Sequence, residues 1–445
     1  MKFEIDKQTI NDLELFEKNK EQKSIISLFY FTKSFGGKER LKNMFYNPFT
    51  DVNFIEKRIS GIRFFQANDF DIYIDKECLG FIEHYLKQHD VPVKFSVFNS
   101  VINKLFYRNQ PNEQFIIQRG IRFLIFFLNQ IYIFMKDLEG DDYPELILNF
   151  RKSIVGKVEN TSLKSALSYK KRVRLFHHEY CKLDFFFRNT EVNNIKELLD
   201  VIYEIDALKA VACAAVKHGF EFPVFTEKSN HFTVRGIIHP LLENPVPNDF
   251  SFTYHKSVCF LTGPNMAGKS TFLKSLGISV YLAHLGFPVP AKYMETSLFS
   301  GLLTTINLSD NINKGYSHFY NEVLRVKYVA ERINEAGNIF TIFDELFRGT
   351  NVKDAYDASL AVISAFSKLN KGVFAISTHI IEIAEKLNDN KSIFYKYFEA
   401  NMIDEKPQYT YTLNDGVTNE RIGMYILKKE KVLETIEKGI NLKYT

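Results

Sequence analysis

The stretch Gly263-Pro264-Asn265-Met266-Ala267-Gly268-Lys269-Ser270 decides how the second half of this 445-residue chain folds. It fits the phosphate-loop pattern G-x-x-x-x-G-K-[ST] and lies between the apolar run Val258–Thr262, which we expect to be a buried strand, and a helical pattern, as that motif requires. Small residues in such a loop let backbone N–H groups face phosphates. A glycine-rich turn with a chance lysine is the other interpretation. We expect Gly263 through Thr271 to bind ATP, with Lys269 on the β- and γ-phosphates and Ser270 holding Mg²⁺.

Two further apolar runs, Ile339–Phe343 and Val373–Ser377, are each followed by residues suited to nucleotide chemistry. Asp344 is placed to join the Mg²⁺ sphere, and Glu345 beside it to polarise the attacking water, although an acidic helix cap would look similar. His379 could contact the γ-phosphate or that water, but a histidine at a strand end is often structural. Because strand ends share one edge of an open α/β sheet, we expect these side chains to meet there.

The composition excludes several classes of protein. Hydrophobic residues make up 45% and charged residues 25% of the chain, which is typical of a globular protein. A net charge of +4 is too small to indicate a nucleic-acid partner by itself. The cysteines lack the spacing of a zinc or redox motif. No signal-peptide pattern opens the chain, and the apolar run Phe123–Met135 is shorter than the about 20 residues of a membrane span. We expect a cytoplasmic protein with a buried helix at that run and no membrane association.

The organisation changes along the chain. The length exceeds the roughly 250–300 residues of a single core, so two or more domains are expected. Residues 12–206 show mostly helical spacing, whereas after Arg235 short apolar runs alternate with helical patterns, as in a parallel sheet. Residues 409–413 alternate like a hairpin strand, 414–416 suggest its closing turn, and the tail from Glu420 has a helical pattern. One long helix is indicated by the apolar stripe of Ile195, Leu198, Ile202, Ile205, Leu208 and Ala212.

Taken together, these motifs resemble the ATPase domain of the MutS family, which is related to the ABC-type ATPases. The shared features are GPNMAGKST at 263–271, DELFRGT at 344–350, STH at 377–379 and His239-Pro240-Leu241. The resemblance implies an α plus α/β fold, in which a helical core and lever domain precedes a P-loop ABC-type ATPase domain with a mostly parallel sheet. It also implies that Glu345 is the catalytic base and that His379 contacts the γ-phosphate.

A second family motif concerns the assembly. Gly315-Tyr316-Ser317-His318-Phe319 precedes a helical stretch, so Ser317 could simply cap that helix. In the MutS family the serine of this segment reaches across a dimer to the partner's ATP, which implies a homodimer here. The chain departs from the family pattern at three positions. Phe347 and Ala355 stand where the family has glycine, and His318 stands where it has threonine.

The N-terminal half resembles the core and lever helices of the family, through Asp6, Thr9, Leu13-Glu14-Leu15 and the segment 32–41. The chain starts at the core domain, so we expect the N-terminal mismatch-reading domains to be lacking and do not expect the usual wedge to read mismatches. The predicted domains are a helical core start at 1–85, lever helices with a possible reduced clamp at 86–228, the P-loop ATPase domain at 229–400, and a hairpin with a C-terminal helical dimerisation segment at 401–445.

The densest basic cluster consists of Lys170, Lys171, Arg172 and Arg174, where a lever or clamp of the family would approach a DNA backbone. A solvated helix face is the other interpretation. The expected function is ATP-dependent DNA binding in mismatch repair, with hydrolysis driving clamp-like opening and closing on mismatched or branched duplexes. One alternative is a MutS-like ATPase that acts on branched or recombining DNA, or on another nucleic-acid complex, without mismatch recognition. A remoter one is a P-loop small-molecule kinase, which would not need Ser317, Glu345 and His379 together.

Overall fold

The structure is a computed structural model, and it divides the chain into two compact units. Unit 1 comprises Met1–Leu28, Pro48–Ile55 and His218–Thr445, and unit 2 comprises Phe29–Asn47 and Glu56–Lys217. The residues that it describes are 2–19, 23–68, 76–88, 111–138, 140, 142–171, 175–307, 318–403, 406–418, 431–432 and 435–436.

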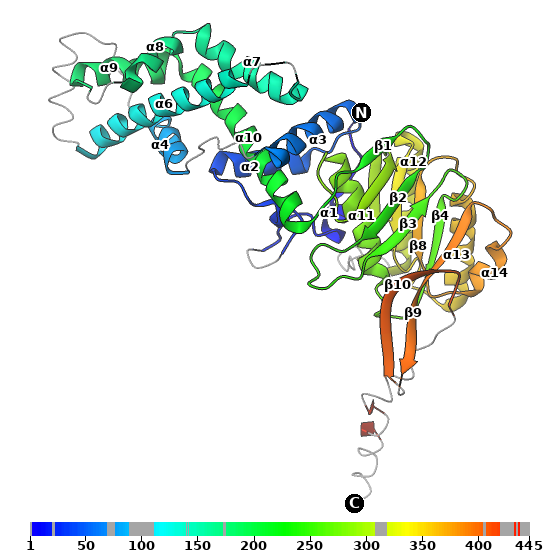
Figure 1. Ribbon diagram of the computed structural model, residues 1–445. Coiled ribbons are helices and arrows are strands. Elements are labelled where there is room, and N and C mark those ends of the chain that lie inside the picture. Colours follow the sequence, from blue (N-terminus) through cyan, green and yellow to red (C-terminus); the bar gives the residue numbers. More distant parts are fainter. Residues whose placement is uncertain are drawn as a thin grey trace, which may run out of the picture. The chain divides into compact units, whose positions relative to one another are not determined.

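Unit 2 is built from helices (Figure 1). They are α2 (Phe35–Tyr46), most of α3 (Val52–Ala67), α4 (Lys76–Leu86), α6 (Pro111–Asp137), α7 (Glu145–Glu159), α8 (Leu163–Leu167), η2 (Ser168–Lys171), α9 (His177–Phe185), the π-helical turn η3 (Phe186–Thr190) and α10 (Val192–His218). The long predicted helix is confirmed, because all six residues of its apolar stripe are buried in α10. Gly219, at φ +65°, follows its last residue and stops it.

A buried carboxylate fixes the first turn of α2. Asp206 of α10 accepts the backbone N–H groups of Lys33 at 2.9 Å and Ser34 at 2.8 Å, and the Ser34 hydroxyl at 2.6 Å. Ser34 in turn caps α2 by accepting the N–H of Gly37. A Cβ at Gly37 would lie 2.1 Å from this carboxylate, so the close approach of α2 to α10 requires glycine there.

Among the described helices, α6 alone is long and apolar enough to cross a membrane by length and composition, over Asn112–Asp137. Half of its apolar window is buried inside the protein, and a core helix of a soluble protein passes the same test. It packs on α4, α7 and α9 of its own unit.

Unit 1 carries two sheets (Figure 1). A six-stranded sheet has the order β10-β9-β4-β8-β7-β6, in which only the β9–β10 pair is antiparallel. Its strands are β4 (Val258–Thr262), β6 (Gly301–Thr305), β7 (Ile339–Phe343), β8 (Val373–Ser377), β9 (Ile393–Ile403) and β10 (Lys406–Asp415). A four-stranded sheet has the order β1-β5-β2-β3, from β1 (Val224–Thr226), β2 (Phe232–Ile237), β3 (Asn248–Phe252) and β5 (Tyr293–Ser297).

The three predicted core strands are confirmed as β4, β7 and β8, and every residue in them is buried. They are buried because both faces of the sheet are covered. On one face, Phe343 stacks on Phe366 of α13, and α12 and α14 share that core. On the other face, Phe340 packs against Phe252 of β3, alongside α11. These helices are α11 (Lys269–His284), α12 (His318–Ala336), α13 (Val352–Phe366) and α14 (Glu382–Leu387).

The prediction that residues 414–416 close the hairpin is wrong. Asn414 and Asp415 belong to β10, where they pair with Tyr397 and Lys396 of β9, and the strands instead pair through to Ile403 and Lys406. Gly416, at φ +118°, ends the strand. The β9–β10 hairpin projects from the sheet (Figure 1). The tail from residue 420, for which a helix is predicted, lies almost wholly outside the described residues.

Candidate active site

The loop between β4 and α11 folds tightly because three of its residues have positive φ. They are Gly263 at +142°, Met266 at +67° and Gly268 at +102°. A Cβ at position 263 would lie 2.9 Å from the carbonyl oxygen of Phe398, so glycine is required both by conformation and by space. The first turn of α11 follows at once, and its free N–H groups favour an anion.

Lys269 lies at the centre of this loop. Its ammonium donates to the carbonyls of Gly263 at 2.8 Å and Pro264 at 3.0 Å. Burial lowers the pKa of Lys269, while the nearby carboxylates of Glu345 and Asp344 act in the opposite direction. The side chain is therefore held against the loop backbone, within the sequence stretch where we expect the phosphates.

Asp344 and Glu345 leave β7 beside the end of β8. The hydroxyl of Ser377 donates to Oδ1 of Asp344 at 2.5 Å and accepts the backbone N–H of Glu345 at 2.8 Å. The N–H of Asp344 donates to the carbonyl of Thr305, at the end of β6. The position of Asp344 is thus set from both neighbouring strands. Sequence reasoning missed this role of Ser377, for which the only signal is a hydroxyl at the end of a buried strand.

Glu345 and His379 meet, as expected for strand ends at one sheet edge. Nε2 of His379 lies 2.9 Å from Oε1 of Glu345, and Arg348 donates to Oε2, also at 2.9 Å. The hydrogen bond from His379 is the main cause that lowers the pKa of Glu345 to about 2, with Arg348 adding to it against the opposing effect of burial. Arg348, whose side chain is 70% exposed, is a second residue that sequence reasoning missed.

A cavity of about 490 Å³ opens beside the loop and is lined by Lys269, Ser270, Glu345, His239 and Tyr411, together with apolar residues of the segment 242–246. Burial lowers the pKa of His239 to about 4, so its imidazole is neutral at neutral pH. Its Nδ1 is buried without a hydrogen-bond partner in the described part of the chain. A cleft with both polar and apolar walls and an unsatisfied buried nitrogen, next to a phosphate loop, fits a nucleotide.

The wall of this cavity includes the hairpin. The amide of Asn248, on β3, donates to the carbonyl of Tyr411 at 3.0 Å and accepts the N–H of Leu413 at 2.7 Å. These two bonds explain why β10 is irregular at this point, where its register with β9 shifts between Tyr409 and Leu413. They hold Tyr411, at φ +55°, on the cavity.

A second cavity of about 240 Å³ is lined by Ser270 and Glu345 as well, together with Asp344, Thr305 and Asn307. The hydroxyl of Ser270 and the carboxylate of Asp344 are hard oxygen donors of the kind that Mg²⁺ prefers. The donor set on this cavity therefore fits the predicted magnesium ion.

The structure does not describe three of the other predicted residues. Ser317 lies outside the described residues, as do Arg172 and Arg174 of the basic cluster. Lys170 and Lys171 end η2 in unit 2, and Lys170 is exposed. The predicted roles of Ser317 and of the basic cluster stay predictions.

The fold and the site define a class: a protein of mixed helix and sheet, in which a G-x-x-x-x-G-K-S loop joins a buried strand to a helix at the edge of a largely parallel sheet. Within this class, the sequence model described as MutS domain V matches residues 259–441. Residues 259–441, which include the phosphate loop, Asp344, Glu345 and His379, are thus similar to domain V of the MutS family.

Several curated relatives are named as DNA mismatch repair proteins. The DNA mismatch repair protein MutS of Ehrlichia ruminantium (strain Gardel) is 30% identical over 230 residues, which are 51% of this chain and 28% of the relative. MutS of Petrotoga mobilis is 24% identical over 294 residues, 65% of this chain and 36% of the relative. The DNA mismatch repair protein MSH3 of Vanderwaltozyma polyspora is 28% identical over 265 residues, 56% and 25% respectively. The chain thus spans about a quarter to a third of these relatives' length.

Proposed function

We propose that this chain hydrolyses ATP at the edge of the six-stranded sheet and uses the cycle to open and close on DNA as a homodimer. The observation that carries the proposal is the adjacency of β4, β8 and β7. Their carboxyl ends bring the phosphate loop, His379 and the Asp344–Glu345 pair to one edge. Glu345 lines the same cavity as Lys269, and its carboxylate contacts His379 directly.

Each side chain has a defined task in this proposal. Lys269 leaves the loop carbonyls to neutralise the phosphates, and the N–H groups of the loop and of α11 hold their oxygens. Ser270 and Asp344 hold Mg²⁺, which when bound neutralises charge on the phosphate oxygens. Ser377 keeps Asp344 in place. Glu345 accepts a hydrogen bond from the attacking water and so aligns it with the γ-phosphate.

In its present contacts, Glu345 is not yet arranged to accept a proton. With His379 and Arg348 both on its carboxylate, the pKa of Glu345 is about 2, and a carboxylate of such low basicity is a poor proton acceptor. Turning Arg348 away would leave an oxygen for water and raise the pKa of Glu345. His379 can keep its hydrogen bond to the other oxygen and orient the carboxylate.

The test is Glu345→Gln. Glutamine preserves the size of the side chain but cannot accept a proton, so we expect ATP affinity to stay within about threefold while kcat falls by about 10²- to 10⁴-fold, the usual contribution of a general base. ATP affinity is measured by equilibrium titration, and hydrolysis by phosphate release. Glu385→Gln, an exposed change on α14, is the matched control and should keep both values.

Normal turnover in Glu345→Gln would remove Glu345 from the role of base. Wild-type protein that binds ATP but passes its γ-phosphate to a small-molecule acceptor in place of water would favour the kinase alternative. Failure of the wild-type protein to bind ATP at all would refute the proposal.

Action on DNA is supported by the relatives, which are named as DNA mismatch repair proteins, and it is proposed for this chain on that ground. The experiment is a fluorescence titration, with and without ATP, against perfect, mismatched and branched duplexes at one salt concentration, because affinity for DNA depends on salt. Tighter binding to mismatches supports mismatch repair. A preference for branched duplexes supports the recombination alternative. No binding to any duplex refutes the DNA partner.

A further inference from the structure

The first residues of the chain are part of unit 1 and lie along β6. The N–H of Glu4 donates to the carbonyl of Ser300 at 2.8 Å, and the carbonyl of Glu4 accepts the N–H of Leu302 at 2.9 Å. Glu4 therefore pairs with β6 in parallel. A Cβ at Gly301 would lie 2.5 Å from the carbonyl oxygen of Glu4, which explains the glycine. The short helix α1 (Lys7–Asp12) follows and reaches the carboxyl end of β6.

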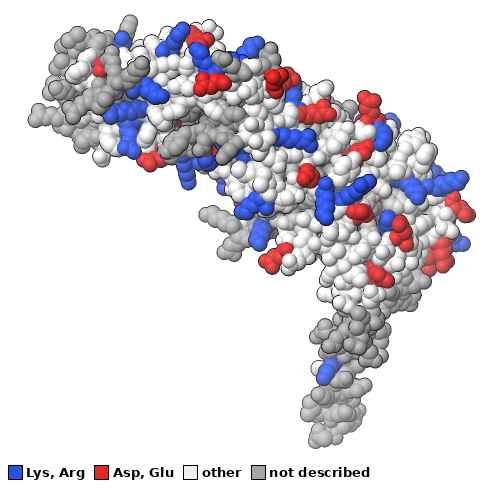
Figure 2. Space-filling view, in the orientation of Figure 1, with Lys and Arg blue, Asp and Glu red and all other residues white. Residues whose placement is uncertain are grey.

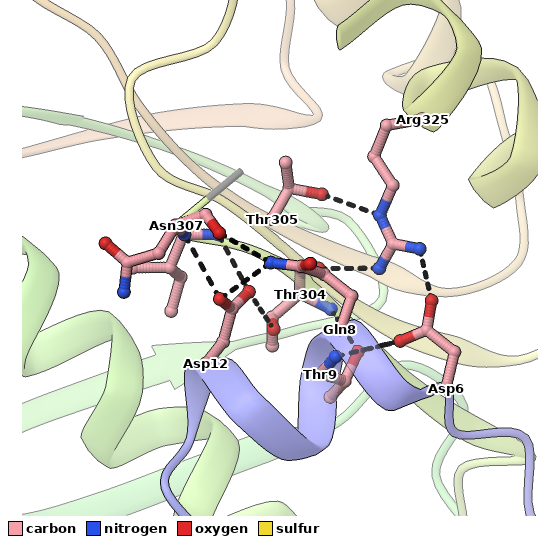
Figure 3. Close-up of polar contacts among 9 residues, drawn as sticks. Asp6, Gln8, Thr9, Asp12, Thr304, Thr305, Asn307 and Arg325 are labelled. Carbon is pink, nitrogen blue, oxygen red and sulfur yellow. Dashed lines mark hydrogen bonds and ion pairs between the residues drawn. The ribbon is translucent and has the colours of Figure 1, made fainter. Parts of the chain in front are cut away.

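Asp12, the last residue of α1, holds that end of β6 (Figure 3). Its Oδ2 accepts the Thr304 hydroxyl at 2.8 Å and the N–H of Ile306 at 2.9 Å. Its Oδ1 accepts the N–H of Asn307 at 3.1 Å and the amide of Gln8 at 2.9 Å. The side chain is only 1% exposed, so these donors replace water completely.

Four other contacts reinforce the same attachment. The N–H of Thr304 donates to the Thr9 hydroxyl at 2.9 Å. The guanidinium of Arg325, on α12, pairs with Asp6 and also donates to the carbonyl of Thr304 and the hydroxyl of Thr305 (Figure 3). The backbone from residue 304 to residue 307 is therefore fixed by side chains of the N-terminal segment and of α12 together.

The backbone of residues 304–307 borders the candidate magnesium site. Thr305 and Asn307 line the smaller cavity with Ser270 and Asp344. The carbonyl of Thr305 accepts the N–H of Asp344 at 2.9 Å. Asp12 thus acts on the residues on both sides of Thr305, and Thr305 carries the hydrogen bond to the predicted magnesium ligand.

We propose that Asp12 is a positioning residue of the ATP site: through the N–H groups of Ile306 and Asn307 it sets the end of β6, and so the place of Asp344 and the shape of the magnesium cavity. The inference rests on the proposed ATPase function. It assigns to α1 a part in catalysis, although Asp12 and Ile306 are 294 residues apart in the sequence. Asp12 itself does not line either cavity.

The test is Asp12→Asn. An amide has one acceptor oxygen where the carboxylate has two, so at least one of the N–H groups of Ile306 and Asn307 loses its partner. We expect kcat to fall by about tenfold or more, because misplaced catalytic groups lower rates steeply. The Mg²⁺ concentration for half-maximal activity should rise by several-fold. ATP binding without Mg²⁺ should change little, because the loop and the larger cavity are untouched.

The matched control is Asp206→Asn. Asp206 is also a buried carboxylate that accepts two backbone N–H groups and a hydroxyl, but it lies in unit 2. The Asp206→Asn change should lower the free energy of unfolding, but the Mg²⁺ dependence of ATP hydrolysis, measured without DNA, should stay the same. If Asp12→Asn proves unable to fold, Thr304→Val removes one donor to Asp12 and should give the same change in smaller measure.

Hydrogen exchange, measured together with activity, distinguishes a positioning role of Asp12 from a purely structural role. Faster exchange at the amides of residues 306 and 307 in Asp12→Asn, with wild-type kcat and Mg²⁺ dependence, would overturn the positioning role while leaving the ATPase intact. Equal losses of activity in Asp12→Asn and Asp206→Asn would overturn it too, because they would reflect stability alone. A wild-type protein without ATPase activity would refute the proposed function itself, and the inference with it.

Discussion

Phe347 occupies a backbone conformation that favours glycine. Its φ is +60°, its side chain is 2% exposed, and its ring centroid lies 5.5 Å from that of Phe319 in α12. The MutS pattern has glycine at this position. The strain of the left-handed conformation is therefore offset here by an aromatic ring packed under the loop that carries Glu345.

Comparing Phe347→Ala with Phe347→Gly separates these two effects. Both changes remove the ring, and Phe347→Ala should destabilise the protein by about 3–5 kcal/mol, as for a buried phenylalanine. Glycine also removes the strain, so Phe347→Gly should be the more stable of the two by about 1 kcal/mol. Urea unfolding of the three proteins gives both values. Equal stability of the two variants would show that the loop relaxes without strain.

At this scale, the sequence predicts residues whose partners are close in the chain or belong to a motif. The loop 263–271 and the pair Asp344–Glu345 are of this kind. Ser377 and Asp12 are not, because each acts on a segment far away in the sequence, Ser377 on Asp344 and Asp12 on Ile306. A hydroxyl or a carboxylate in an ordinary helical or strand pattern carries no local sign of such a partner.

The strands show the same division at the scale of elements. Runs buried on both faces are predicted to the residue, since only a covered parallel strand is apolar throughout. The local turn signal at 414–416 misleads, because the pairing of β10 with β9, which extends through Asn414 and Asp415, outweighs it. The second sheet is not foreseen, because its strands pair across the sequence order, as β1 does with β5.

His284, at the end of α11, joins three segments and gives a pH-dependent stability. Its Nδ1–H donates to the carbonyl of Phe49 at 2.8 Å, and its Nε2 accepts the N–H of Phe299 at 3.3 Å. Burial lowers the pKa of His284 to about 4 in the folded protein, against 6.5 for a free histidine. Below pH 6.5 the unfolded chain takes up a proton that the folded protein refuses until about pH 4, so stability falls with pH across this range.

His284→Gln tests this, because glutamine can donate and accept at the same place but does not titrate. Between neutral pH and about pH 5, His284 should lower the free energy of unfolding of the wild-type protein by about 2 kcal/mol. In His284→Gln the free energy of unfolding should therefore fall by about 2 kcal/mol less over the same pH range. His239 shifts the same way and remains in both proteins. The exposed change His255→Gln serves as control, and the prediction fails if all three proteins lose stability in parallel.

The sequence did not predict which segments belong to which of the two units. The first 28 residues have a helical, core-like pattern but belong to unit 1, with the sheets, and residues 48–55 join them there. A helical pattern states which face is apolar and not which neighbour will cover it. The predicted boundaries at 85, 228 and 400 stay predictions.

Charge on the surface bears on the DNA proposal. On the face shown in Figure 2, charges of both signs are interspersed over unit 1, and Lys and Arg side chains lie close together on the part of unit 2 that carries α6 and α9. Changing Lys170, Lys171, Arg172 and Arg174 to glutamine should weaken DNA binding and lower the slope of log affinity against log salt by about 0.9 for each phosphate that is no longer neutralised. Basal ATPase activity should be unchanged.

The control for this variant carries the same loss of charge elsewhere. Lys353, Lys371, Lys386 and Lys391 are exposed on unit 1, and changing all four to glutamine removes four positive charges without touching the cluster. If both fourfold variants lower the salt slope equally, then the cluster is an ordinary solvated face and DNA is attracted by overall charge.

The homodimer is tested by mixing two inactive proteins. Ser317→Ala should be inactive because each site lacks the partner's serine, and Lys269→Ala because each site lacks its own lysine. In a mixed dimer, the Ser317→Ala subunit keeps Lys269 and receives Ser317 from the other subunit, so one of the two sites is complete. With random exchange half of the dimers are mixed, so equal amounts should recover roughly a quarter of wild-type activity, as expected for a two-fold symmetric assembly. If subunits are shown to exchange and ATPase activity still does not recover, then Ser317 acts within its own chain, as a helix cap does. Full activity of Ser317→Ala alone would remove it from the site altogether.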